Sequence, residues 1–202
     1  MPQRVGVVLA GGRGRRLGRP KAEIEFEGTT LAARAAGRVW PLCGSVLISV
    51  AEAGENPARA YPSIVDSPPA GRGPLVGIDA AFAATGDADL LVLACDYPFV
   101  TTELLGRLAA TPDGAENLIM MTDFGGRDHP LVALWRREAA PVVRAALAEG
   151  RHKVRALLAD LSVLRLGPAE FPGLDLDRAL FNVNEPEHLE RLRSGMSGTW
   201  PS

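Results

Sequence analysis

A basic, glycine-rich segment follows the first apolar run of the chain and has the residue types that bind phosphate. Residues 9–21 read Leu-Ala-Gly-Gly-Arg-Gly-Arg-Arg-Leu-Gly-Arg-Pro-Lys, directly after the apolar residues 5–8. Glycine lets backbone N–H groups approach an anion closely, arginine donates paired hydrogen bonds to phosphate, and lysine adds a mobile charge. The segment therefore predicts a loop that binds a polyphosphate.

The spacing within this loop differs from that of two common phosphate-binding loops. A P-loop requires a lysine directly after its last glycine, whereas Gly18 is followed by Arg19 and Pro20. A dinucleotide-binding loop requires a third glycine at the position of Leu17. A P-loop ATPase and a dehydrogenase are both disfavoured. The remaining structural alternative is a solvated basic turn without a ligand.

Asp96 is the candidate metal ligand. It is the first charged residue after the apolar run 90–95, and Pro98 prevents that strand from continuing. Magnesium takes one or two carboxylates, phosphate oxygens and water as ligands. A carboxylate that faces a polyphosphate loop therefore predicts an Mg²⁺ site. The alternative is a helix cap, a role that Thr101 or Thr102 can fill instead.

Alternating strands and helices must position these residues. Such alternation predicts an α/β fold with a mostly parallel central sheet and helices on both faces. Ligands of these sheets bind outside the carboxyl ends of the strands, where the basic loop, Asp66 and Asp96 all fall. Strands are expected at 5–9, 45–50, 63–65, 89–94, 118–121, 129–134 and 163–166, and helices at 31–42, 75–84, 101–110, 136–149, 152–160 and 186–192.

Length and composition favour one globular domain. The chain has 202 residues, and we expect one domain over 1–193 and a flexible C-terminal tail over 194–202. The formal net charge of −2 indicates neither a nucleic-acid nor a membrane partner. Cys43 and Cys95 lack metal-ligand spacing, and neither a membrane-spanning run nor a signal peptide is recognisable. We therefore expect a cytoplasmic protein.

Several further polar groups are ambiguous when each is read alone. Asp66 precedes Ser-Pro and could form a turn, and the glycine-rich segment 71–77 could contact a nucleotide or simply turn the chain. The other groups are His129-Pro130, Asn182-Val183-Asn184 and the basic stretch 150–153, for which a structural role is the simpler interpretation.

Taken together and in order, these motifs resemble the molybdenum cofactor guanylyltransferase family. The resemblance runs from Val5 to Leu192 and rests on the first loop, Gly73-Pro74-Leu75, Cys95-Asp96, His129-Pro130 and the run from Phe181 to Pro186. The first loop and Asp96 are shared with other glycine-rich nucleotidyltransferases. The other three motifs are more specific to this family. The resemblance implies a three-layer, Rossmann-like nucleotidyltransferase fold.

The resemblance also implies a reaction and a set of site residues. GTP and the phosphate of molybdopterin are the substrates it implies, with Mg²⁺ as cofactor: that phosphate attacks the α-phosphorus of GTP and expels pyrophosphate. Catalytic roles fall on Arg16, Lys21 and Asp96, with Asp96 as the metal ligand. The implied nucleotide-binding residues are Leu9, Ala10, Gly11, Gly12, Arg13, Lys21, Asp66, Gly73, Pro74 and Asp96. The implied residues on the pterin side are His129, Arg151, Lys153, Asn182 and Asn184.

Two positions differ from the family pattern and leave the base specificity open. Pro20 precedes the loop lysine where well-known members have an acidic residue, and Ser49 stands where an asparagine is common. The alternatives are a cytidylyl- or guanylyltransferase for another phosphorylated acceptor, and a catalytically silent module that binds nucleotide or delivers cofactor. The resemblance further suggests transient contact with cofactor-insertion proteins or apo-molybdoenzymes.

Overall fold

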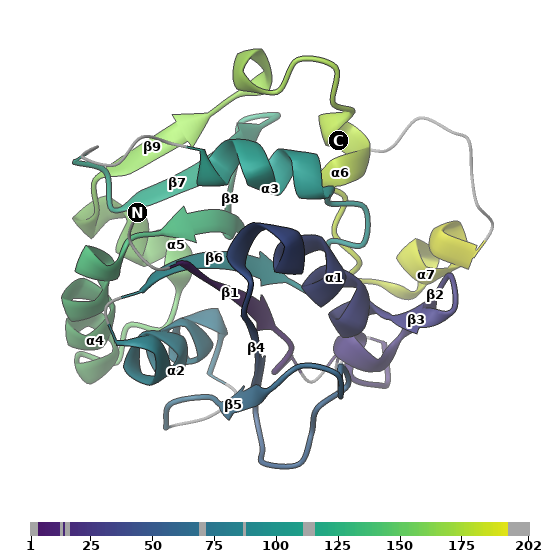
Figure 1. Cartoon of the computed structure of the whole chain (residues 1–202), viewed down its shortest axis with the longest axis horizontal. Helices are drawn as coiled ribbons and strands as arrows, with labels where there is room; N and C mark the ends of the chain where they lie inside the picture. The colour runs from purple at the N-terminus through teal and green to yellow at the C-terminus, as the bar shows by residue number, and fades with distance from the viewer. Residues whose placement is uncertain are drawn as a thin grey trace.

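Short apolar runs form the strands of a seven-stranded sheet in the order β5-β4-β1-β6-β8-β7-β9 (Figure 1). The computed structural model describes residues 4–12, 14, 17–68, 72–86, 88–110 and 116–193. All six residues of β6 are buried, as are the last five of β1, so these strands form the centre of the core. The strands of the sheet are β1 (Arg4–Leu9), β4 (Val46–Val50), β5 (Ser63–Val65), β6 (Asp89–Ala94), β7 (Ile119–Phe124), β8 (Arg127–Trp135) and β9 (Val163–Leu166).

Most neighbouring strands in the sheet are parallel. β1 pairs in parallel with both β4 and β6, β4 pairs in parallel with β5, and β7 pairs in parallel with β9. Only β8 is reversed, and it runs antiparallel to β6 and to β7. The reversal follows from the turn Gly125-Gly126, whose φ angles of 60° and 69° form a tight hairpin that joins β7 to β8.

Helices cover both faces of the sheet. The chain moves outward from β1 to β4 through α1 and returns from β5 to β6 through α2, and right-handed crossovers put these helices on opposite faces. α3 packs against α1 and α4 against α2 (Figure 1). This arrangement confirms the predicted α/β class. The helices are α1 (Leu31–Cys43), α2 (Pro74–Thr85), α3 (Thr102–Ala109), α4 (Ala140–Ala148), α5 (Val154–Leu157), α6 (Leu176–Ala179) and α7 (Pro186–Arg193), with 3₁₀ turns at Lys21–Glu23, Arg137–Ala139, Leu158–Asp160 and Pro168–Glu170.

Local sequence explains where the helices begin and end. The Thr30 side chain accepts a hydrogen bond from the Ala33 N–H at 3.2 Å and caps α1, and Thr101 caps α3 in the same way. α1 ends at Gly44, which has a φ of 68°. Among the residues that the structure describes, no helix is both long and apolar enough to cross a membrane.

Some elements differ from the sequence-based prediction. The single helix expected over 136–149 is a 3₁₀ turn followed by α4, because Pro141 is tolerated only in the first turn of a helix. The small hairpin of β2 (Glu25–Phe26) and β3 (Thr29–Thr30) was not predicted. The tail expected over 194–202 lies outside the described residues, and the domain boundary at 193 stays a prediction.

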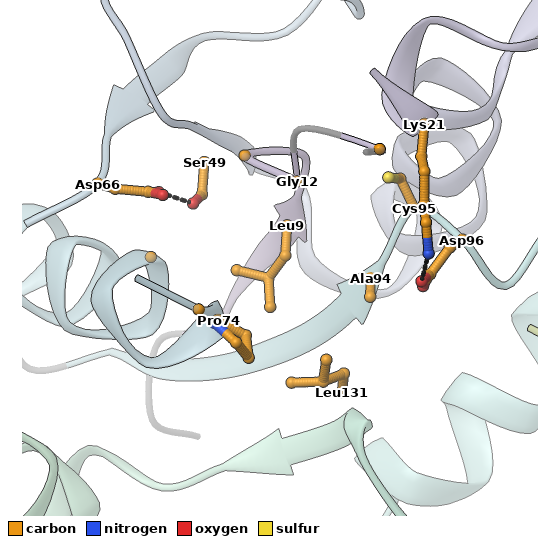
Figure 2. A pocket seen from close by; sticks show the side chains of 14 residues that line it. Leu9, Gly12, Lys21, Ser49, Asp66, Pro74, Ala94, Cys95, Asp96 and Leu131 are labelled. Carbon is orange, nitrogen blue, oxygen red and sulfur yellow. Dashed lines mark hydrogen bonds and ion pairs between the residues drawn. The ribbon is translucent and has the colours of Figure 1, made fainter. Parts of the chain in front are cut away.

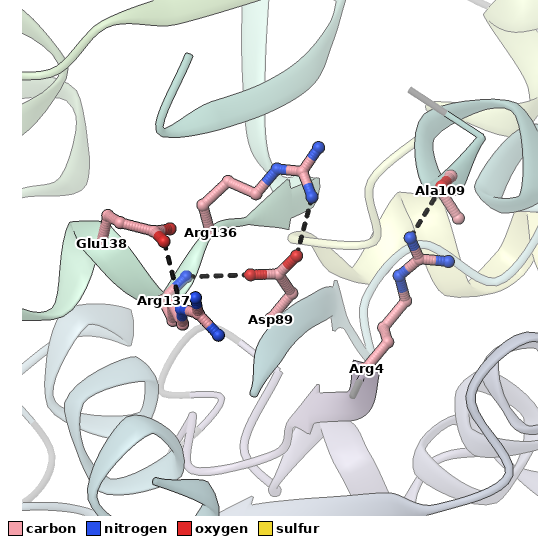
Figure 3. Close-up of polar contacts among 6 residues, drawn as sticks. All are labelled: Arg4, Asp89, Ala109, Arg136, Arg137 and Glu138. Atoms are coloured by element: carbon pink, nitrogen blue, oxygen red, sulfur yellow. Dashed lines mark hydrogen bonds and ion pairs between the residues drawn. The ribbon is translucent and has the colours of Figure 1, made fainter. Parts of the chain in front are cut away.

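A buried ion pair lies at the amino end of β6. This end of the sheet is opposite the carboxyl ends of the parallel strands. Arg136 Nη1 donates to Asp89 Oδ2 at 2.8 Å, and the Arg137 N–H donates to Asp89 Oδ1 at 3.1 Å (Figure 3). Asp89 is 2% exposed and Arg136 6%. Nearby, Arg4 of β1 donates to the Ala109 carbonyl of α3 at 2.8 Å. These contacts fix the central strands to their neighbours far from the candidate site.

Candidate active site

The carboxyl ends of β1, β4, β5 and β6 bring the predicted loop and both predicted aspartates to one edge of the sheet. Hydrogen bonds extend the strand pairing into the loops: Ala10 N–H donates to Ser49 O, Asp66 N–H to Val50 O, and Cys95 N–H to Leu9 O. A cavity of about 460 Å³ opens there (Figure 2). Its lining residues are Leu9, Gly11, Gly12, Gly14, Lys21, Ser49, Asp66, Gly73, Pro74, Gly77, Ala94, Cys95, Asp96 and Leu131.

One end of this cavity carries an ion pair between Lys21 and Asp96. Lys21 Nζ donates to Asp96 Oδ2 at 3.0 Å, and both side chains are less than a fifth exposed. The same ammonium also donates to Asn184 Oδ1. Asp96 Oδ1 is buried and accepts no hydrogen bond among the described residues. A buried carboxylate oxygen without a donor is suited to bind a cation.

The other end of the cavity carries a hydrogen-bonded pair of Ser49 and Asp66. Ser49 Oγ donates to Asp66 Oδ1 at 2.5 Å, and both residues are buried. Burial raises the pKa of Asp66 above its usual value, and the hydrogen bond from Ser49 opposes this rise. Figure 2 shows this pair and the Lys21–Asp96 pair on opposite sides of Leu9. The cavity therefore presents an ammonium group and a carboxylate oxygen without a hydrogen-bond donor at one end and hydrogen-bond acceptors at the other.

Two glycines make room for the Asp66 carboxylate. A Cβ atom on Gly11 would lie 2.7 Å from Asp66 Oδ2, and one on Gly77 would lie 2.3 Å from Ser49 Oγ and 3.0 Å from Asp66 Oδ1. Real Cβ atoms essentially never lie closer than 3.0 Å to another heavy atom, so a side chain at either position would displace the Ser49 hydroxyl or the Asp66 carboxylate. The glycine-rich segment near 77 thus has a packing role that is specific to this cavity.

The sequence resemblance implies that this cavity binds GTP. On that basis we expect Gly77→Ala to weaken GTP binding about tenfold, because Ser49 must rotate away and release its hydrogen bond to Asp66. Isothermal titration calorimetry of the protein with GTP and Mg²⁺ measures this change in affinity. Gly106→Ala on α3 is the matched control, since its Cβ would meet only Leu42 Cδ2 at an ordinary 3.6 Å. Equal affinities for the two variants would show that the packing around Asp66 is irrelevant to binding.

A second cavity has a volume of about 360 Å³. Asp96 lines the first cavity and the next residue, Tyr97, lines the second. The Tyr97 hydroxyl lies 3.3 Å from His129 Nδ1 and hydrogen-bonds Asn182. The second cavity is lined by Tyr97, Phe124, Gly125, Arg127, Asp128, His129, Arg155, Leu176, Asp177, Leu180, Phe181, Asn182, Asn184 and His188.

Two side chains of the second cavity, those of His129 and Tyr97, are neutral at pH 7. Burial, aided by the charges of Arg127 and Arg155, lowers the pKa of His129 to about 4, so the imidazole is neutral at pH 7. Burial also raises the pKa of Tyr97 to about 12, so its hydroxyl keeps its proton. Arg127 and Arg155 offer donors to an anionic group of a polar ligand, and Asp128 and Asp177 line the same cavity as acceptors.

The C-terminal segment after α6 lines the second cavity and packs against the loop that carries Asp96. The Val183 N–H donates to the Asp96 carbonyl at 2.9 Å, and Val183 is completely buried. Its two neighbours, Asn182 and Asn184, line the second cavity. The His188 ring accepts a hydrogen bond from the Asn184 N–H at 3.1 Å and holds this segment in place. The late asparagine motif is therefore held directly against the Asp96 loop.

The structure brings most of the predicted site residues to these two cavities. The first cavity is lined by eight of the predicted nucleotide-binding residues, namely Leu9, Gly11, Gly12, Lys21, Asp66, Gly73, Pro74 and Asp96. The second is lined by three of the residues predicted for the pterin side, namely His129, Asn182 and Asn184. Ala10 lines a smaller cavity of about 230 Å³ that it shares with Gly11 and Gly12.

The remaining predicted residues lie elsewhere. Arg13 and Arg16 fall outside the described residues. Arg151 pairs with Glu149 and Asp160 at 2.8 and 2.5 Å, and neither Arg151 nor the exposed Lys153 is part of the lining of the two larger cavities. Their assignment to the pterin side stays a prediction.

Sequence reasoning missed several lining residues. Arg155 belongs to the second cavity and follows the basic stretch 150–153 by two positions, so that stretch was the available signal. Arg127 directly follows the Gly125-Gly126 turn, and Tyr97 directly follows Asp96. Leu176, Leu180 and His188 carried no local signal, because they reach the cavity only through the packing of α6 and α7.

Fold and site together define a nucleotidyltransferase. A family model described as "MobA-like NTP transferase domain" matches residues 6–166. This match covers the sheet, the basic loop, both aspartates of the first cavity and His129.

Individual relatives identify the family within the nucleotidyltransferases. The "Molybdenum cofactor guanylyltransferase" of Cereibacter sphaeroides is 36% identical over 197 residues, which cover 94% of this chain and 95% of that protein. The "Probable molybdenum cofactor guanylyltransferase" of Pelotomaculum thermopropionicum is 32% identical over 194 residues, covering 96% and 93%. The crystal structure of molybdopterin-guanine dinucleotide biosynthesis protein A from Archaeoglobus fulgidus superposes with a TM-score of 0.81 at 27% identity and covers 95% of this chain and 100% of that one. The chain belongs to the molybdenum cofactor guanylyltransferase family.

Proposed function

We propose that the protein transfers GMP from GTP to the phosphate of molybdopterin and releases pyrophosphate. The observation that carries this proposal is the position of Lys21 and Asp96. Both line the first cavity, and Lys21 donates a hydrogen bond to Asn184, which lines the second. A nucleotidyltransferase needs one site for the nucleotide, one for the acceptor, and cationic groups where the two sets of phosphates meet. The family membership supports the assignment of GTP and molybdopterin to these sites.

The nucleotide fits the first cavity in one direction. The triphosphate belongs at the end with Lys21 and the glycine-rich backbone of Gly11 and Gly12, because that end offers a cation and close-approaching N–H groups. The base and ribose then reach the other end, where Asp66 and Ser49 present oxygen acceptors. Guanine offers adjacent N–H donors at N1 and N2, which two such acceptors can bind.

Asp96 is the residue that would hold Mg²⁺. Its buried Oδ1 lacks a donor, and no group of three or more His, Cys, Asp or Glu residues that could form a complete metal cage occurs in the described part of the chain. Magnesium fits such a site, because it needs one or two carboxylates and takes its other ligands from phosphates and water. When bound, the ion would polarise the α-phosphate and neutralise charge on the phosphates.

The residues of the chain mainly position the reactants and neutralise charge. Lys21 offsets the negative charge that grows on the leaving pyrophosphate, and the loop arginines Arg13 and Arg16 are predicted to act with it. The acceptor phosphate is already a nucleophile, so the reaction does not require a general base. Tyr97, His129 and Asn182 would orient the acceptor through neutral hydrogen bonds.

The acceptor belongs in the second cavity, whose lining residue Asn184 accepts a hydrogen bond from Lys21 of the first cavity. Arg127 and Arg155 at its wall suit an anionic ligand, and apolar side chains of α6 and of the C-terminal segment provide a surface for a ring system. Contacts with cofactor-insertion proteins or apo-molybdoenzymes, the cytoplasmic location and the roles of Arg151 and Lys153 stay predictions from the sequence.

A nucleotide panel tests the proposed function. The purified protein is incubated with Mg²⁺, molybdopterin and each ribonucleoside triphosphate in turn, and pyrophosphate release is measured. We expect release with GTP at least about a hundredfold faster than with ATP, CTP or UTP, because a site that hydrogen-bonds one base rejects others strongly. Preference for CTP would contradict the guanine assignment. Nucleotide binding without turnover would instead support the silent module.

A further inference from the structure

We propose that Asn184 is a positioning residue for the nucleotide phosphates, which it reaches through Lys21, in addition to lining the acceptor cavity. This inference rests on the proposed function, since it assigns the first cavity to a nucleoside triphosphate. It differs from the sequence-based prediction, which gave Asn184 a role on the acceptor side alone.

The contacts of Lys21 carry the inference. Its ammonium group has three N–H donors. One donates to Asp96 Oδ2 at 3.0 Å and a second donates to Asn184 Oδ1. These two partners fix the direction of the third N–H. In the described part of the chain Lys21 Nζ donates to these two side chains alone, and Lys21 lines the first cavity, so the third N–H is available to a phosphate oxygen there.

Lys21 can keep both of its hydrogen-bond partners, Asp96 and Asn184, when a nucleotide binds. Asp96 uses Oδ2 for Lys21 and keeps Oδ1 for a metal ion. Asn184 uses Oδ1 for Lys21, and its amide N–H groups remain for a ligand in the second cavity. One asparagine side chain thus contacts the phosphate-binding lysine with one atom and faces the acceptor cavity with the other.

Asn184 itself is held firmly enough to position a flexible lysine. The preceding residue, Val183, is fully buried and bonded to the Asp96 carbonyl, and the Asn184 N–H donates to His188 Nδ1 at 3.1 Å. A lysine side chain has four rotatable carbon–carbon bonds, and ordering it costs entropy whenever a ligand binds. A fixed acceptor in the free enzyme removes part of that cost before the nucleotide arrives.

The test measures nucleotide affinity in the absence of any acceptor. Wild type and Asn184→Ala are titrated with Mg²⁺ and α,β-methylene-GTP, and in parallel with the CTP analogue. We expect the Kd of Asn184→Ala to rise about tenfold, because a hydrogen bond to a charged group is lost. Asn182→Ala is the matched control: Asn182 contacts Tyr97 rather than Lys21, so its nucleotide Kd is expected to stay within about twofold of wild type.

A double-mutant cycle with Lys21→Met separates positioning from a merely structural role. If Asn184 acts through Lys21, adding Asn184→Ala to Lys21→Met changes the Kd by less than about twofold. Asn184→Ser, whose hydroxyl is too short to reach Lys21, is measured alongside and is expected to match Asn184→Ala. Thermal melting of each variant checks that the fold is retained.

Several outcomes would overturn the inference. These are an unchanged Kd in both Asn184 variants, an equal loss in Asn182→Ala, and a full tenfold loss in the Lys21→Met background. The two nucleotide analogues keep this result distinct from the proposed function. If wild type prefers the CTP analogue and Asn184→Ala still weakens its binding, the guanine assignment fails while the role of Asn184 stands. Binding of neither analogue by wild type would overturn both.

Discussion

Asp96→Ala is expected to lower turnover at least about a thousandfold, which corresponds to a loss of about 4 kcal/mol of transition-state stabilisation. The variant removes both carboxylate oxygens of Asp96: Oδ1, which is the proposed metal ligand, and Oδ2, which accepts a hydrogen bond from Lys21. Initial rates of pyrophosphate release with Mg²⁺, GTP and molybdopterin measure the loss. The fold should persist, because the Asp96 side chain bonds only Lys21 among the described residues.

The control for this variant is Glu103→Ala. Glu103 is a carboxylate on α3 that is 59% exposed and pairs with Arg107 one helical turn away. Exposed pairs of this kind contribute little, so we expect normal turnover and normal stability. If Asp96→Ala kept its metal-dependent turnover, the assignment of the metal to this carboxylate would be wrong.

Asp89→Ala is expected to destabilise the protein by about 3–5 kcal/mol without a direct effect on the site. The substitution removes a buried carboxylate that accepts hydrogen bonds from Arg136 Nη1 at 2.8 Å and from the Arg137 N–H at 3.1 Å (Figure 3). For a chain of this length, such a loss lowers Tm by on the order of 10 °C. Thermal and urea unfolding monitored by circular dichroism measure the change.

Glu138→Ala is the matched control for the stability prediction. Glu138 pairs with Arg137 in the same region at 3.1 Å, but its side chain is 56% exposed. The free energy of unfolding is expected to change by less than about 1 kcal/mol. Similar losses in the two variants would mean that burial does not decide the importance of these ion pairs.

The parts of the site that depend on local pattern could be predicted from the sequence. The basic loop and Asp96 each directly follow an apolar strand, and the rule for parallel sheets places such residues at the same edge. Lys21 and Asp96 are separated by 75 positions and lie in contact as this reasoning requires. Asp66 follows β5 and reaches the same cavity for the same reason.

The remaining features depend on contacts that local pattern does not encode. The Lys21–Asn184 hydrogen bond joins residues 163 positions apart, and it forms only because Val183 is buried against the Asp96 loop. The need for glycine at 77 follows from a steric approach to Ser49 that spacing does not reveal. The β2–β3 hairpin was missed because its turn includes Glu27 at a φ of 49°, a conformation for which glutamate gives no signal.

The claim that the protein transfers GMP to molybdopterin is tested most directly by following the α-phosphate of GTP. The protein is incubated with Mg²⁺, molybdopterin and GTP labelled in turn at the α- and the γ-phosphate, and the products are separated. Nucleotidyl transfer at the Lys21–Asp96 junction predicts that the α-label enters a molybdopterin–guanine dinucleotide and the γ-label leaves as pyrophosphate. Recovery of the α-label as free GMP or GDP, or of the γ-label as inorganic phosphate, would contradict it.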